Sequence, residues 1–125
     1  MTPRRILVAE DDSSLREALK EVLTIAGYTP VLVGDGVRAL ECARADPPDL
    51  IILDHVMPGL DGLGVLRALQ ADPGLCKIPV IVLTGAAGDF PPEHGAAALI
   101  EKPFRMQPLQ DAVRSILAAR PTAKP

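Results

Sequence analysis

Five polar side chains that follow short apolar runs are the candidates for chemistry in this 125-residue chain. Three are carboxylates: Glu10 and Asp11 are adjacent in the sequence, and Asp54 lies farther along. Thr84 and Lys102 follow two later apolar runs. A carboxylate nucleophile, a cation that neutralises charge and a hydroxyl donor are the parts that phosphoryl transfer needs. The sequence therefore predicts phosphoryl chemistry with Asp54 as the nucleophile.

The three carboxylates also predict a divalent cation. Carboxylates at close quarters repel one another and have raised pKa values unless a cation joins them. Oxygen ligands with room for waters suit Mg²⁺. We therefore expect a magnesium site formed by Glu10, Asp11 and Asp54.

Parallel strands before these side chains would allow them to meet. The run Leu50–Leu53 is continuously apolar before Asp54, which is typical of a strand covered by helices on both faces. Parallel strands place their carboxyl ends at one edge, where open α/β sheets bind ligands. The segment His55–Gly62 is rich in Pro and Gly and predicts a loop, which we expect to leave Asp54 open to solvent.

Strand and helix patterns alternate about five times, which predicts an α/β fold with a doubly wound parallel sheet and right-handed crossovers. Ser14 and Glu17 have the spacing of a capping box that starts the first helix, and Gly27 ends it. The second helix is expected to turn Val37 inward. The segment Gly85–Gly95 leaves room only for a short or irregular helix. The remaining strands are expected over residues 6–9, 28–33, 79–83 and 98–100.

Length and composition argue for one domain, over residues 1–119, followed by a tail or linker over residues 120–125. The net charge is −3, and the only basic run is Arg4-Arg5, so direct nucleic-acid binding has little electrostatic support. The first apolar run is too short for a signal peptide or a membrane span, so we expect a cytoplasmic protein without a membrane partner. Cys42 and Cys76 lack metal-ligand spacing and are interpreted as small buried hydrophobes.

Four motifs in order give the chain a family resemblance over Arg5 to Ala119. The chain resembles the CheY-like receiver domains of two-component response regulators. The motifs are Ile6-Leu7-Val8-Ala9-Glu10-Asp11-Asp12, Asp54-His55-Val56-Met57-Pro58-Gly59-Leu60-Asp61-Gly62, Leu83-Thr84-Gly85 and Glu101-Lys102-Pro103-Phe104.

The resemblance implies a flavodoxin-like (βα)₅ fold with strand order 2-1-3-4-5. It also implies a Mg²⁺-dependent phosphorylation by a sensor histidine kinase or a histidine phosphotransfer protein. Asp54 would be the phosphoacceptor, Asp11 a direct metal ligand, Glu10 a ligand through water, and the backbone carbonyl of Val56 a further ligand. The phosphorylated domain would control a downstream protein or an output domain.

Three more positions take roles from the same resemblance. Thr84 would be the switch hydroxyl, Lys102 the cation that neutralises the phosphoryl group, and the Lys102-Pro103 peptide would be cis. The family usually has an aromatic switch residue where this chain has Leu99, and the 17 residues between Thr84 and Lys102 are fewer than usual. The fourth helix is therefore expected to be shortened or replaced by a loop.

The sequence leaves two other functions open. It also leaves open whether the chain is a stand-alone receiver or a piece of a longer regulator. Leu99 and the short segment before it favour a receiver-like module that binds partners without phosphorylation. A Mg²⁺-dependent phosphohydrolase would need a second acid near Asp54, but position 56 is Val. We expect a phosphoacceptor, not a multiple-turnover enzyme.

Several polar residues are given structural interpretations. Asp12 is expected to be solvated or to cap a helix, and Asp61 to be a turn residue. His55 and His94 lack partners at metal-ligand spacing.

Overall fold

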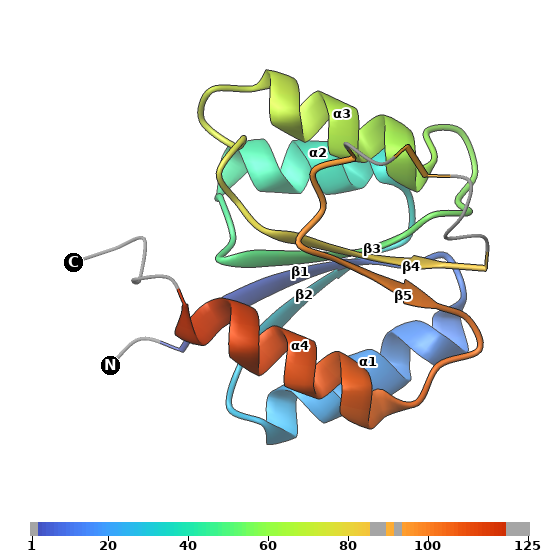
Figure 1. Cartoon of the computed structure of the whole chain (residues 1–125), viewed down its shortest axis with the longest axis vertical. Helices are drawn as coiled ribbons and strands as arrows, with labels where there is room; N and C mark the ends of the chain where they lie inside the picture. The colour runs from blue at the N-terminus through green and yellow to red at the C-terminus, as the bar shows by residue number, and fades with distance from the viewer. Residues whose placement is uncertain (1–2, 86–89, 92–93, 120–125) are drawn as a thin grey trace.

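The computed structural model describes residues 3–85, 90–91 and 94–119, in which five parallel strands form one sheet (Figure 1). Their order across the sheet is β2-β1-β3-β4-β5, which confirms the flavodoxin-like order expected from the resemblance. The strands are β1 (Arg5–Ala9), β2 (Thr29–Val33), β3 (Leu50–Asp54), β4 (Val80–Thr84) and β5 (Ala98–Glu101). The helices are α1 (Ser13–Ile25), α2 (Gly36–Ala45), α3 (Gly62–Ala71) and α4 (Met106–Ala118).

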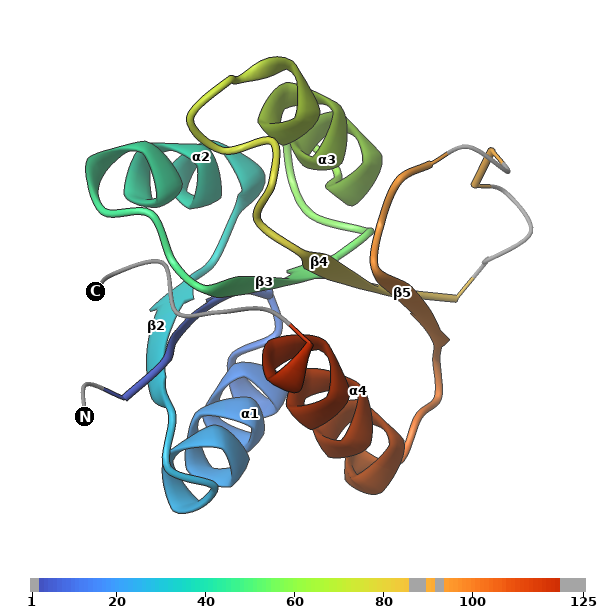
Figure 2. The same cartoon turned by 60° about the vertical axis from the view of Figure 1, so that its left-hand side comes forward.

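The helices cover both faces of the sheet. Figure 2 shows α2 and α3 on one face and α1 and α4 on the other. This arrangement explains the continuous apolar run of the central strand, because every residue of β3 is buried. Alternate residues face opposite sides, so Ile51 and Leu53 join one core cluster while Leu50 and Ile52 join the other.

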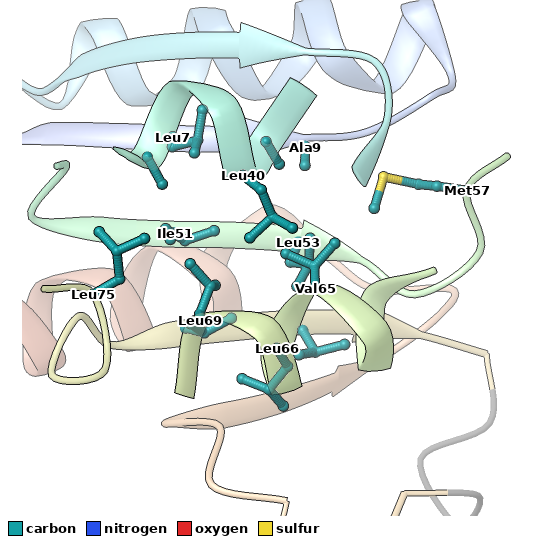
Figure 3. Close-up of a cluster of buried hydrophobic side chains, with 14 of the residues drawn as sticks. Leu7, Ala9, Leu40, Ile51, Leu53, Met57, Val65, Leu66, Leu69 and Leu75 are labelled. Atoms are coloured by element: carbon teal, nitrogen blue, oxygen red, sulfur yellow. The ribbon is translucent and has the colours of Figure 1, made fainter. Parts of the chain in front are cut away.

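The core on the side of α2 and α3 also holds the loop that follows β3. Met57 lies in this loop and is only 6% exposed, and its side chain points toward the same cluster as Leu53 and Val65 (Figure 3). The loop that follows Asp54 is therefore anchored by apolar packing and not only by its turn geometry.

Aspartates start three of the helices. Oδ1 of Asp12 accepts hydrogen bonds from the backbone N–H groups of Ser14 and Leu15, so α1 begins at this cap. The capping box predicted from Ser14 and Glu17 is therefore wrong, because Asp12 already takes the N-cap position two residues earlier. Asp61, expected to be a turn residue, caps α3 by accepting from Gly64 N–H. Gly27 has a φ of 96°, as an αL glycine after a helix requires.

The connection between β4 and β5 contains no helix in the part of the chain that the structure describes. Residues 86–89 and 92–93 of the expected short segment, and the expected tail 120–125, lie outside the described residues. Phe90 belongs to the core cluster on the side of α2 and α3, and Leu99 of β5 packs against the same cluster. A single aromatic side chain from this connection thus fills part of that face.

Two predicted burials are wrong. Val37 is 54% exposed, because Gly36 before it, and not Val37, is buried against Leu60 and Val65. Cys76 is exposed in the turn after α3, where its thiol donates to the carbonyl of Pro73, and Cys42 is half-buried. Among the described residues, no helix has the length and apolar character that a membrane crossing needs.

Candidate functional site

Parallel pairing carries the predicted site residues to one edge of the sheet. The strand arrows in Figure 1 point to this edge. Asp54 ends β3 beside Leu83 of β4, and Thr84 ends β4 beside Glu101 of β5. Glu10 follows β1 directly, and its N–H donates to the carbonyl of Val33 at the end of β2. The sheet therefore converts positions far apart in the chain into neighbours.

Glu10, Asp11 and Asp54 form the acidic group of the site. One carboxylate oxygen from each residue lies within 4.8 Å of the other two. Octahedral Mg²⁺ with ligands at about 2.1 Å places opposite ligands about 4 Å apart. The three carboxylates therefore fit a magnesium ion with small adjustments, and Oε1 of Glu10 is buried without a hydrogen-bond partner.

Lys102 supplies a positive charge at the same place. Its Nζ lies 2.8 Å from Oδ1 of Asp54 and 3.6 Å from Oε1 of Glu10. The expectation that the loop leaves Asp54 open is wrong, because the Asp54 side chain is only 4% exposed. The ammonium lies against this carboxylate because opposite charges attract strongly where water is excluded. Asp11 is the exposed member of the acidic group.

The electrostatics of the site follow from its burial. Burial raises the pKa of Glu10 to about 7. The hydrogen bond from Asp12 N–H lowers this pKa, the Asp54 carboxylate raises it, and the Lys102 charge lowers it. Burial disfavours the charged form of Lys102, but its hydrogen bond to Asp54 and the charges of Asp54 and Glu10 raise its pKa above 10.5. Lys102 therefore keeps its charge at neutral pH, while Glu10 is close to its titration midpoint.

The hydroxyl and switch candidates lie on adjacent strands. Thr84 is 1% exposed, and its backbone carbonyl accepts a hydrogen bond of 2.8 Å from Lys102 N–H. This bond fixes the start of the Lys102 loop relative to β4, and the Lys102-Pro103 peptide that follows is cis. Leu99 pairs with Val82 and packs against the core cluster under α2 and α3.

The loop after Asp54 is shaped by a glycine that sequence reasoning did not single out for this role. Gly62 N–H donates to the carbonyl of His55, and a Cβ on Gly62 would lie 2.6 Å from His55 Cα and 2.8 Å from the Asp54 carbonyl. Only glycine allows the start of α3 to approach the end of β3 this closely. Val56 lies in the same loop with its side chain 72% exposed.

Both histidines contact the ring of Phe90, and neither belongs to the acidic group. The ring of Phe90 contacts His55 at a centroid distance of 4.7 Å and His94 at 6.1 Å, both edge to face. The contact between His55 and Phe90 links the residue after Asp54 to the connection between β4 and β5. No periodicity in the sequence could have indicated it, because both residues lie in irregular segments.

Comparison with known proteins agrees with this geometry. The family model described as "Response regulator receiver domain" matches residues 6–114. The chain is 40% identical over 118 residues to the DNA-binding response regulator MtrA of Mycolicibacterium paratuberculosis, covering 91% of this chain and 51% of that protein. The chain thus spans about half the length of the curated relatives it matches.

Solved structures give the same result. A receiver domain of a signal transduction histidine kinase from Syntrophus aciditrophicus has a TM-score of 0.86 and 34% identity, covering 98% of this chain and 97% of that one. A receiver domain of a sensor histidine kinase from Pseudomonas aeruginosa, with a magnesium ion coordinated in its active site cleft, has a TM-score of 0.85 and 28% identity, covering 94% and 99%. The fold, the order of the motifs and these matches together show that the chain belongs to the family of response regulator receiver domains.

Proposed function

We propose that this chain is a phosphorylation-switched signalling domain in which Asp54 accepts a phosphoryl group from a sensor histidine kinase or a histidine phosphotransfer protein. The observation that carries this proposal is the position of Lys102 Nζ 2.8 Å from the Asp54 carboxylate, which itself lies in one acidic group with Glu10 and Asp11. The Asp54 carboxylate thus lies beside a neutralising cation and beside two further carboxylates that could bind a metal. Residues 1–119 form the acting unit in this proposal.

The transfer step conserves atoms and charge. An oxygen of the Asp54 carboxylate attacks the phosphorus of a phosphohistidine, the P–N bond breaks, and an acyl phosphate forms on Asp54. The departing imidazole nitrogen keeps the bonding pair and takes up a proton. The protein contributes position and charge, which supply most of the catalysis in phosphoryl transfer.

Lys102 and Thr84 would stabilise the transferred group. The Lys102 ammonium already contacts Asp54, so a short rotation of its side chain would pair it with a phosphoryl oxygen. The Thr84 side chain ends the neighbouring strand and would donate its hydroxyl to another oxygen. Each well-placed donor of this kind contributes roughly 10²-fold or more to rate.

Glu10, Asp11 and Asp54 would hold Mg²⁺, with the Val56 carbonyl as a further ligand. When bound, Mg²⁺ neutralises the charge that develops on the phosphoryl oxygens. The fit rests on three carboxylate oxygens within 4.8 Å of one another and on the buried Oε1 of Glu10, which accepts no hydrogen bond from the described residues and lies 3.6 Å from the Lys102 ammonium. When Glu10 is ionised, the three carboxylates carry more negative charge than the Lys102 ammonium neutralises, so a bound divalent cation would balance the remaining charge.

Phosphorylation would then change how the domain binds a downstream protein or an output domain. Thr84 would respond to the new phosphoryl group, and Leu99 with the connection before β5 would transmit the change. This proposal places the protein in the cytoplasm, where its kinase would meet it, and gives the domain no nucleic-acid contact of its own.

Intact-mass measurement tests the proposal. Incubation with acetyl phosphate and Mg²⁺ should add one phosphoryl group, and EDTA or Asp54→Asn should abolish the addition. Asp111→Asn, which changes an exposed carboxylate on α4, is the matched control and should leave the addition unchanged. A phosphorylated Asp54→Asn protein would place the acceptor elsewhere.

A second function is favoured by Leu99, which leaves β5 without the aromatic switch of the family. In that case the domain binds its partner equally well with and without phosphate. Comparing partner affinity for the free and the beryllofluoride-bound protein separates the two functions. Turnover of p-nitrophenyl phosphate in the same assay would instead indicate a phosphohydrolase, which Val56 disfavours.

A further inference from the structure

We propose that Arg16 is a positioning residue for this site: by binding the Glu10 carbonyl from α1, it sets the direction in which Glu10 and Asp11 present their carboxylates to the metal. This inference rests on the proposed function, since it concerns the same site. Arg16 lies in the first turn of α1 and is half-buried. Its Nη1 donates a hydrogen bond of 2.8 Å to the backbone oxygen of Glu10.

Glu10 is held at three points, and Arg16 supplies one of them. Its backbone N–H donates to the Val33 carbonyl at 3.1 Å, which extends the pairing of β1 with β2. Its side-chain Oε2 accepts from Asp12 N–H at 3.1 Å. Its backbone carbonyl accepts from Arg16. With these three bonds made, Oε1 alone is left for the metal and for Lys102.

The same hydrogen bond also acts on Asp11. The peptide group that carries the Glu10 carbonyl also contains the Asp11 nitrogen, and this group is planar. When the carbonyl is fixed, the plane of the group and the direction of the Asp11 Cα are fixed with it. The orientation of both carboxylates that follow β1, those of Glu10 and Asp11, therefore depends on the hydrogen bond from the Arg16 guanidinium.

Gly34 gives the guanidinium its room. A Cβ built on Gly34, just past the end of β2, would lie 3.2 Å from Arg16 Nη1, closer than ordinary packing distances. The absence of a side chain at position 34 therefore lets Arg16 reach between the ends of β1 and β2. Figure 1 shows α1 leaving β1 at this edge of the sheet.

The test compares magnesium affinity with stability. Arg16→Met keeps most of the length but removes the donor, so we expect the Mg²⁺ dissociation constant measured by calorimetry to rise about tenfold, as for other residues that orient metal ligands. The melting temperature in EDTA should change much less than the one in saturating Mg²⁺. Arg16→Lys keeps one donor and should recover part of the affinity. Lys20→Met, on an exposed position of the same helix, should match the wild type.

The kinetics give an independent readout. With acetyl phosphate as donor, Arg16→Met should require more Mg²⁺ for half-maximal phosphorylation and should approach the wild-type rate when Mg²⁺ saturates. A lower saturating rate with an unchanged Mg²⁺ requirement would overturn the inference. So would equal losses of melting temperature with and without Mg²⁺, which a purely structural role predicts.

A second variant covers the case in which Arg16→Met does not fold. Gly34→Ala presses on the guanidinium by a few tenths of an ångström and should raise the dissociation constant in the same direction by a smaller factor. An unchanged affinity in a folded Gly34→Ala protein would overturn the inference. Failure of the wild type itself to bind Mg²⁺ would overturn the proposed function, whereas wild-type binding with unaffected Arg16 variants would overturn the Arg16 inference alone.

Discussion

Lys102 Nζ lies 2.8 Å from Oδ1 of Asp54, although the two residues come from opposite sides of β4 in the sheet order. The contact shields an almost fully buried carboxylate with a cation that is about one-third exposed. In this structure the ammonium neutralises Asp54. If Asp54 is phosphorylated as proposed, the same charge would be available to the phosphoryl group.

Lys102→Met should slow phosphorylation by acetyl phosphate by about 10²-fold, because it removes a charge aimed at the transferred group. The same variant should bind Mg²⁺ more tightly, since the carboxylates lose the cation that competes with the metal. Lys20→Met is a control for loss of an exposed lysine. A slower rate together with weaker Mg²⁺ binding would mean that Lys102 organises the site and does not act on the phosphoryl group.

Asp11→Asn and Asp12→Asn should differ sharply, although the residues are adjacent. Asp11 belongs to the acidic group, so its loss should weaken Mg²⁺ binding at least tenfold, and relief of carboxylate repulsion should slightly stabilise the metal-free protein. Asp12 caps α1, and Asn caps helices about as well, so both affinity and stability should change little. Equal losses of affinity in a calorimetric titration would show that the ligand assignment is wrong.

Asp12→Ala provides the complementary measurement. It should lower the free energy of unfolding by about 1 kcal/mol through loss of the helix cap. Its Mg²⁺ affinity should fall far less than that of Asp11→Asn. Urea denaturation in EDTA reports the first quantity and calorimetry the second.

The stability of the metal-free protein should fall as pH rises from 4.5 to about 7. The pKa of Glu10 is raised from 4.5 to about 7 in the folded state, so across this range the native state binds more protons than the unfolded state. At about 1.4 kcal/mol per pH unit, a rise in pKa from 4.5 to about 7 limits the effect to about 3 to 4 kcal/mol. Glu10→Gln should remove this slope in urea denaturation at pH 5 and pH 8, and a wild-type slope of the opposite sign would contradict it.

Magnesium binding should respond to the same group. Below about pH 7 the metal must displace the proton of Glu10, so the apparent Mg²⁺ affinity should decrease as pH is lowered. Binding at pH 6 should therefore release protons, which calorimetry in buffers of different ionisation enthalpy detects. Glu10→Gln should bind more weakly and release fewer protons.

Phosphorylation should change hydrogen exchange around Phe90 and from His94 to Leu99. The Phe90 ring contacts His55, which follows Asp54, so this contact and Thr84 offer two routes from the site to the connection before β5. A phosphoryl group shifts a pre-existing equilibrium only through contacts that differ between the two states. Protection should rise there when beryllofluoride and Mg²⁺ are added, and Asp54→Asn should show no change. A response restricted to α1 and α2 would refute this route.

The sequence by itself determined the strands and the set of candidate residues. Four apolar runs predict strands, and the polar residue after each run marks the end of the strand. A strand covered on both faces shows no alternation of apolar and polar residues, so the end of the apolar run is the available signal. These runs and the polar residues after them predicted the parallel sheet and the acidic group. The strand order came from the family resemblance, which rests on motifs that contain Glu10, Asp54, Thr84 and Lys102.

Only the tertiary structure decided how these residues meet. The burial of Asp54 under Lys102, the contact of His55 with Phe90, and the bond from Arg16 to the Glu10 carbonyl all join segments whose separation along the chain carries no periodic signal. The raised pKa of Glu10 is likewise a property of its enclosure. Side-chain type and spacing specify which groups can reach the edge of a sheet, whereas distances and desolvation depend on how the loops pack over it.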